Sequence, residues 1–203
     1  IPNFKNKDYI IDLSGSVESS EGKKDLNKID KYPIFIEKIR SFYNSIDVLI
    51  NNASAFYSTP LKNYKENDWE ILHNSNLRGP FLISSLLKDN IKEDKGCIIN
   101  ITDAMVIRGM KDYAIYSTAK GGLETLTKSL ARDLAPEITV NAVAPGAILL
   151  PSDGSSNEEL LLSKIPLGRL GTEADIASAV FYLSKNKYIT GQILRVDGGR
   201  SLN

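Results

Sequence analysis

The sequence has 203 residues, of which 42% are hydrophobic, and its 25 acidic and 25 basic side chains balance. This length suits one domain with a sizeable core, and the zero net charge favours neither nucleic acid nor a membrane surface as a partner. With one cysteine (Cys97), one histidine (His73), no long apolar run and no signal-peptide pattern, we expect a soluble, cytoplasmic protein without a disulfide, metal site or membrane span.

Short apolar runs alternate with amphipathic stretches along the chain. The first half predicts a strand over residues 9–14, a mobile polar surface loop over 14–33, a helix over 33–43, and strands over 47–54 and 97–102. The strands are mostly apolar enough to be covered on both faces.

The second half continues the alternation. It predicts a helix over residues 117–134, a strand over 138–146, a helix that starts at a capping box from Thr172 to Asp175, and a strand over 192–199. Strand–helix alternation of this kind predicts a parallel sheet with right-handed crossovers.

Tyr116 and Lys120 are the first candidates for chemistry. Four residues apart in a predicted helix, they lie one above the other on the same face. An ammonium close to a phenol lowers the phenol pKa from about 10 and makes the tyrosine a usable general acid. The alternative is a surface tyrosine above a solvated lysine.

Three further motifs follow predicted strands: "LINNAS" at 49–54, "NAVAPGAI" at 141–148 and "VDGG" at 196–199. Together with Y-x-x-x-K, in this order, they resemble the short-chain dehydrogenase/reductase family from about Asp12 to the C-terminus. The resemblance implies a doubly wound, Rossmann-like α/β fold in a single domain over 1–203, and a nicotinamide cofactor.

The resemblance also assigns roles to particular residues. Tyr116 would exchange a proton with the substrate, and Lys120 would lower its pKa and hold the nicotinamide ribose. The residues matched to cofactor contacts are Asp12 and Leu13 beside the adenine, Asn52, Ala53 and Ser54 against the cofactor, and Pro145, Gly146 and Ile148 near the nicotinamide carboxamide.

The helix asparagine of the family matches Asn76, in "NSNLRGPF" at 74–81. Pro80 has no N–H, so the carbonyl of Asn76 loses its helical partner. In this family such a carbonyl holds a water that links the lysine to solvent, which makes Asn76 a catalytic candidate. The alternative for Pro80 is a plain kink in a packing helix.

Most family members carry a serine thirteen residues before the tyrosine, where this chain has Asp103. An ionised carboxylate offers no donor to a carbonyl but accepts from the N–H and amino groups of a heterocycle. This pattern, with "NNASAFYSTPL" at 51–61 and "KGGLETLTKSLARDLAP" at 120–136, resembles the pteridine reductase subgroup. There Phe56 matches an aromatic residue that sandwiches the pterin against the nicotinamide. The alternative for Asp103 is a strand-end carboxylate that caps local backbone amides.

The glycine-rich phosphate turn of the family, T-G-x-x-x-[GR]-[IL]-G, is absent from the 203 residues. In the family strand order 3-2-1-4-5-6, residues 9–14 correspond to strand 3 and residues 47–54 to strand 4. Without strands 1 and 2, we expect residues 9–14 to lack a pairing partner and residues 47–54 to form a long apolar edge. We favour an N-terminally truncated or fragmentary domain over a decayed member that packs differently.

The leading hypothesis is NADPH-dependent reduction of a dihydropterin or dihydrofolate-like ring, with Tyr116 as proton donor, in a homodimer or homotetramer. NADPH follows from the subgroup only, because the residues that select it are not in this chain. The alternatives are a dihydromonapterin reductase, a 3-oxoacyl reductase, and an inactive remnant that acts as a binding subunit.

Overall fold

The structure is a computed structural model, and the residues that it describes include five parallel strands in one sheet, in the order β1-β4-β5-β6-β7. The residues that it describes are 10–11, 18–20, 23–24, 32–43, 45–91, 96–148 and 158–203. The strands of the sheet are β1 (Ile10–Ile11), β4 (Val48–Asn51), β5 (Cys97–Ile101), β6 (Thr139–Pro145) and β7 (Ile193–Val196). The arrangement confirms the predicted Rossmann-like fold class.

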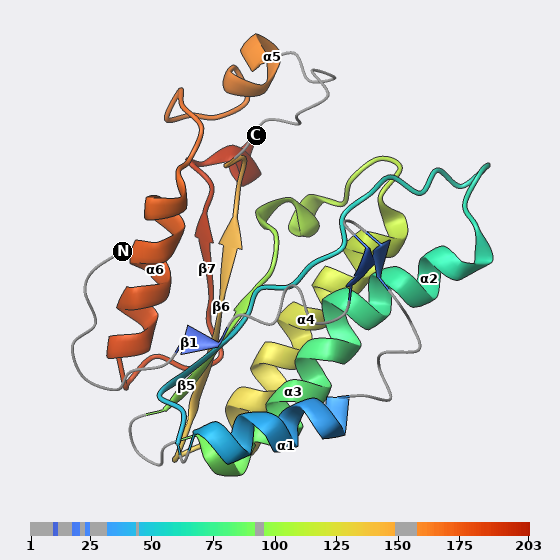
Figure 1. The fold of residues 1–203 in the computed structure, drawn as a ribbon. Helices are drawn as coiled ribbons and strands as arrows, with labels where there is room; N and C mark the ends of the chain where they lie inside the picture. The colour runs from blue at the N-terminus through green and yellow to red at the C-terminus, as the bar shows by residue number, and fades with distance from the viewer. Residues whose placement is uncertain are drawn as a thin grey trace.

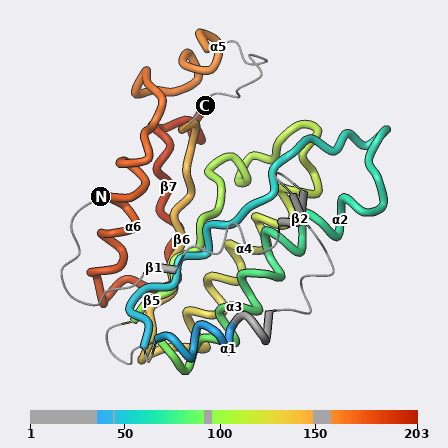
Figure 2. Tube along the Cα trace, viewed as in Figure 1, coloured from blue at the N-terminus to red at the C-terminus, as the bar shows by residue number. Residues whose placement is uncertain are grey.

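Helices cover both faces of this sheet (Figure 1). One face carries α1 (Tyr32–Phe42), α2 (Glu66–His73), α3 (Gly79–Leu87) and α4 (Ala114–Asp133), and the other carries α6 (Glu173–Lys185). The Cα trace in Figure 2 shows α5 (Glu158–Leu162) beyond the upper ends of β6 and β7, near the C-terminus. The segment that follows α5 returns to the end of β7, where the Leu167 N–H donates to the carbonyl oxygen of Gly198.

The shorter elements are turns of helix and one small ladder. They are η2 (Asn74–Arg78), η3 (Lys88–Asn90), η4 (Ala104–Arg108), η5 (Arg200–Leu202), and the antiparallel pair β2 (Glu18–Ser20) and β3 (Lys23–Lys24). The β2–β3 pair lies inside the stretch 14–33 that the sequence predicts as a loop.

Alternation along β5 divides the core into two layers. Ile98 packs with side chains of α1, α3 and α4, whereas Cys97 and Ile99 pack with Leu183 of α6. Each of these four side chains is at most 2% exposed. Successive side chains of a strand point to opposite faces, so a strand covered on both sides is apolar at every position.

The N-terminal strand is paired, contrary to expectation. Ile10 pairs with Val48 and Ile11 with Leu49 in a parallel ladder. The predictions that residues 9–14 have no neighbour and that strand β4 is left as an unpaired edge are therefore wrong. A row of free N–H and C=O groups is a template for any extended segment that reaches it. Here β1 occupies the place beside β4 that the 3-2-1-4 order gives to strand 1.

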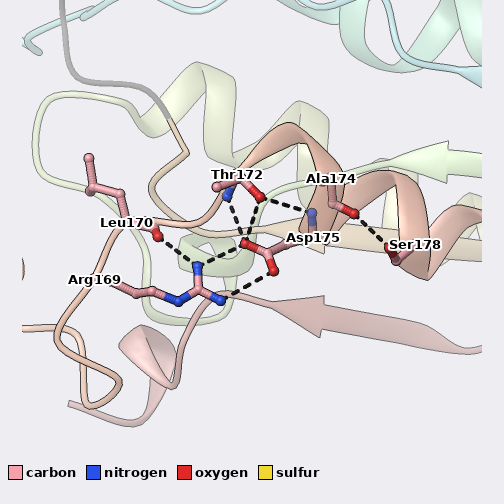
Figure 3. Close-up of polar contacts among 6 residues, drawn as sticks. All are labelled: Arg169, Leu170, Thr172, Ala174, Asp175 and Ser178. Atoms are coloured by element: carbon pink, nitrogen blue, oxygen red, sulfur yellow. Dashed lines mark hydrogen bonds and ion pairs between the residues drawn. The ribbon is translucent and has the colours of Figure 1, made fainter. Parts of the chain in front are cut away.

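The predicted capping box fixes the start of α6 (Figure 3). The Asp175 N–H donates to Thr172 Oγ1 at 3.2 Å, and the Thr172 N–H donates to Asp175 Oδ2 at 2.8 Å. Arg169 binds the same carboxylate, with Nη1 2.9 Å from Oδ2 and Nη2 3.2 Å from Oδ1. The hydrogen bond from Arg169, followed by those from Thr172, holds the pKa of Asp175 below its ordinary value.

Replacing Thr172 with alanine is expected to lower the free energy of unfolding by about 0.5–2 kcal/mol, because alanine leaves the Asp175 N–H without its side-chain acceptor. Thr172→Ser keeps the hydroxyl and should stay close to the unchanged protein. Urea denaturation followed by circular dichroism measures both variants. An equal loss in the two would assign the effect to the threonine methyl group instead of the cap.

Candidate active site

Three predicted site segments follow neighbouring strands at one end of the sheet. Residues 52–54 follow β4, Thr102 and Asp103 follow β5, and residues 146–148 follow β6. Parallel strands end at the same edge, so these segments converge there (Figure 1). Helix α4, which packs on β6, brings Tyr116 to the same edge.

Asp103 joins the end of β5 to Tyr116. The Tyr116 hydroxyl donates to Asp103 Oδ2 at 3.0 Å. The other oxygen, Oδ1, accepts from the backbone N–H of Met105 at 2.8 Å and caps η4. The capping interpretation of Asp103 is therefore confirmed, and the same carboxylate also contacts the phenol, while its role toward a substrate stays a prediction. Because the Met105 N–H holds Oδ1, the carboxylate is oriented with Oδ2 toward the phenol.

Tyr116 and Lys120 are buried, with 4% and 2% of their surfaces exposed. Burial raises the pKa of Tyr116, and the charge and hydrogen bond of Asp103 raise it further, while a hydrogen bond from Ser54 lowers it. Burial lowers the pKa of Lys120 to about 8, against the opposing charge of Asp103. The phenol is therefore protonated at neutral pH, which is the state that a general acid needs.

The position of Lys120 differs from the prediction that it lowers the pKa of Tyr116. Its Nζ donates to the carbonyl oxygen of Ile101 at 2.8 Å and lies 6.0 Å from the centre of the Tyr116 ring. Burial and Asp103, rather than the ammonium, set the pKa of the phenol. The prediction is wrong for this conformation, because the ammonium is turned toward a main-chain carbonyl.

A π-helical turn, η2, carries Asn76 between α2 and α3. Pro80 has no N–H to donate to an α-helical ladder. The preceding residue, Gly79, donates its N–H to the carbonyl of Asn74, five residues back. This widened turn is how the helix accommodates the proline, and single π-turns of this kind occur often at functional sites.

The side chain of Asn76 is fully buried, with 0% exposed. Its Nδ2 donates to the carbonyl oxygens of Ala55 and Leu72, each at 2.9 Å. Its Oδ1 accepts from Ser54 Oγ at 2.6 Å. Sequence reasoning considered only the backbone carbonyl of Asn76 and missed this connection to the segment after β4.

Phe56 belongs to a small aromatic group at the site. Its ring is stacked on Tyr113, with centroids 4.8 Å apart and planes 13° apart, and it meets Tyr116 edge-on at 4.8 Å. Phe56 is 57% exposed, so much of its surface is open to a ligand. Sequence reasoning missed Tyr113, although an aromatic residue three positions before Tyr116 was a usable signal.

The turn after β6 requires glycine at position 146. The Gly146 N–H donates to the carbonyl of Val196 at 2.9 Å. A Cβ added to Gly146 would lie 2.6 Å from the Cα of Asp197, closer than real Cβ contacts. Only glycine allows the two strand ends to approach so closely.

The other predicted cofactor contacts vary in exposure. Asn52 and Ser54 are exposed, whereas Ala53, Pro145 and Ile148 are partly exposed. Asp12 and Leu13 lie outside the described residues. Among the described residues, no helix has the length and apolar character of a membrane span, and no three His, Cys, Asp or Glu side chains gather as metal ligands.

Comparisons with known proteins agree with this geometry. A family profile described as enoyl-(acyl carrier protein) reductase matches residues 10–201. A 3-oxoacyl-[acyl-carrier-protein] reductase, FabG, from Thermotoga maritima is 36% identical over 206 residues, covering 96% of this chain and 84% of the relative. The enzyme of the same name from Staphylococcus epidermidis is 38% identical over 190 residues, covering 90% and 78%.

A solved structure gives the same assignment. The structure of an apo SCOR enzyme from Clostridium thermocellum has 33% sequence identity to this chain and a TM-score of 0.74. The match covers 88% of this chain and 71% of the chain of that enzyme. The chain belongs to the short-chain dehydrogenase/reductase family. The names of the relatives match the 3-oxoacyl reductase alternative and do not support the pteridine reductase subgroup.

Proposed function

We propose that this chain reduces a pterin, as a dihydropterin or dihydrofolate-like ring, with NADPH as the reductant and Tyr116 as the proton donor. The observation that carries the proposal is the 3.0 Å hydrogen bond from the Tyr116 hydroxyl to Asp103 Oδ2. It sets a carboxylate beside the phenol. An ionised carboxylate accepts hydrogen bonds and donates none. It therefore suits ring N–H and amino groups, and it cannot hydrogen-bond to a carbonyl oxygen.

The proton for the substrate comes from the Tyr116 phenol, whose raised pKa keeps it protonated near neutral pH. The hydrogen now directed at Asp103 turns to a ring nitrogen when the substrate is bound. Asp103 keeps its place during this change because its second oxygen stays bonded to the Met105 N–H. The Lys120 ammonium lies 6.0 Å from the centre of the Tyr116 ring.

The aromatic group supports a flat substrate. Phe56 is exposed over 57% of its surface, and Tyr113 stacks on its ring and supports it from one side. Stacking of a planar heterocycle on such a ring contributes about 0.5–1.5 kcal/mol beyond the area that is buried.

A nicotinamide cofactor supplies the hydride when it is bound. By the family resemblance, Pro145, Gly146 and Ile148 would contact the carboxamide, and the exposed Asn52 and buried Lys120 would lie on the ribose side. The phosphate turn is not among these residues, so the preference for NADPH over NADH rests on the subgroup resemblance alone.

A second candidate, reduction of a 3-oxoacyl thioester, is favoured by the names of the relatives. Asp103 argues against it, because a ketone oxygen gains from a hydroxyl donor at that position and not from a carboxylate. A dihydromonapterin reductase would share the aspartate and is the neighbouring pterin candidate.

We also propose a homodimer or homotetramer that associates through the helices with Asn76 and Tyr116. On this side of the molecule Trp69 of α2 is 52% exposed and Phe81 of α3 is 46% exposed. Multi-angle light scattering of the purified protein measures the oligomer, and a monomer would contradict the proposal.

Asp103→Ser is the direct test of substrate choice. In a version that carries the glycine-rich turn of the family, we expect the change to lower kcat/KM for a dihydropterin by about tenfold or more relative to acetoacetyl thioester, because only the heterocycle needs an acceptor there. Loss of NADPH absorbance measures both rates. An equal loss on the two substrates would make Asp103 a structural residue. Turnover of the thioester alone by the unchanged protein would favour the second candidate.

A further inference from the structure

The main chain around Gly171 is held by hydrogen bonds on three sides. The Gly171 N–H donates to the carbonyl oxygen of Ala147 at 2.9 Å, which ties the segment before α6 to the turn after β6. The carbonyl oxygen of the preceding residue, Leu170, accepts from Arg169 Nη1 at 2.9 Å (Figure 3). The following residue is the N-cap of α6, whose N–H is bonded to the carboxylate of the capping box. The main chain at position 171 is therefore restrained from moving.

Position 171 has no room for a side chain. A Cβ added to Gly171 would lie 2.5 Å from Ile148 Cδ1, closer than real Cβ contacts. The next atoms are the carbonyl oxygen of Ala147 at 3.7 Å and Asp175 Oδ2 at 3.9 Å, both at ordinary contact distances. Gly171 is not among the glycines with a positive φ, so its backbone conformation does not require glycine. The side chain of Ile148 is the reason that position 171 must stay bare.

Ile148 lies at the edge of the sheet that carries the candidate site. It is partly exposed and follows β6, beside the segments with Asn52 and Asp103 that follow β4 and β5. In open α/β sheets, ligands bind at this carboxyl edge. Cδ1 is the free end of the Ile148 side chain, and two torsions decide where it points. Because the main chain of residue 171 is restrained, a methyl group there would displace Ile148.

We propose that Gly171 is a positioning residue: because it has no side chain, Ile148 keeps its place at the end of β6 and can pack against the nicotinamide ring of a bound cofactor. This inference rests on the proposed function, which requires a nicotinamide cofactor at this edge. It adds a residue that lies outside the motifs that follow the strands. It also makes the capping box of α6 part of the support of the site.

The test compares two ligands that differ by the nicotinamide ring. ADP-ribose 2′-phosphate is NADPH without that ring. Isothermal titration calorimetry measures the affinity of each for a version of the protein that carries the glycine-rich turn of the family. We expect Gly171→Ala to weaken NADPH by about tenfold, within the usual range of an overpacking effect, and to leave ADP-ribose 2′-phosphate within about twofold.

A second substitution should rescue the first. Ile148→Val removes Cδ1, the atom that the added Cβ would meet, so in this background Gly171→Ala should change the affinity for NADPH by no more than about twofold. Gly121→Ala is the matched control, because its Cβ would meet Val106 Cγ1 at 3.5 Å, an ordinary contact. If Gly171→Ala alone does not fold, the double variant should fold and bind NADPH as Ile148→Val does, and its failure would contradict the proposal.

The outcomes separate this inference from the proposed function. Three results would overturn the role of Gly171 and leave the proposed function standing: an unchanged affinity for NADPH in Gly171→Ala, an equal loss for both ligands, or a loss that persists in the Ile148→Val background. The expected pattern of binding without turnover of a dihydropterin would overturn the proposed substrate and leave the role of Gly171 standing. Failure of the version that carries the turn to bind NADPH would overturn both.

Discussion

Replacing Tyr116 with phenylalanine is expected to lower kcat by about a hundredfold or more in a version that carries the glycine-rich turn of the family, the usual contribution of a positioned general acid. The phenol is the group that holds a transferable proton beside Asp103, and its raised pKa keeps that proton in place until the substrate accepts it. Phenylalanine preserves the ring and its edge-on contact with Phe56. Affinities for pterin and NADPH should therefore change little.

The measurement is steady-state NADPH oxidation with a dihydropterin, together with the dissociation constants of both ligands. Tyr188→Phe is the matched control, because Tyr188 is fully exposed and should lose no activity. Turnover of Tyr116→Phe within a few-fold of the unchanged protein would remove the phenol from the mechanism.

The 203-residue chain alone is expected to bind NADPH about a thousandfold more weakly than a version preceded by the first strand, glycine-rich turn and helix of the family. A dinucleotide pyrophosphate is held mainly by backbone N–H groups of that turn and by the dipole of the following helix. Losing three hydrogen bonds to a charged group, at about 1.5–3 kcal/mol each, accounts for about three powers of ten or more.

Isothermal titration calorimetry of the two proteins measures this difference. The residues that we propose for the nicotinamide side, Asn52, Lys120 and Gly146, are present in both and should leave only weak binding in the shorter chain. Micromolar affinity in the 203-residue chain, with its mass verified, would mean that another segment has taken over the phosphate site.

Much of the site could be predicted because it depends on short-range rules. The apolar runs before Asn52 and Asp103 end at the same edge of a parallel sheet, and the spacing of Tyr116 and Lys120 places them on one helix face. The Thr172 capping box follows from local hydrogen bonding and is confirmed.

Other features depend on contacts between segments that the sequence leaves open. The Lys120 ammonium could reach the phenol or a carbonyl, and only the packing of α4 against β5 brings it to Ile101. The bond from Ser54 to Asn76 spans 22 positions and needs the π-helical turn before Pro80. The pairing of β1 with β4 could not be predicted, because family strand order presupposes strands that this sequence lacks.

That pairing has a consequence for how molecules of this protein meet one another. β4 is an apolar strand of four residues, and left open it would invite a strand from a second copy. β1 covers its first half with only two residues, Ile10 and Ile11. So short a border offers few N–H and C=O groups for a neighbouring chain to extend, and short edge strands are a common natural protection against aggregation. β1 therefore limits the pairing of this sheet edge with the sheet of a second molecule.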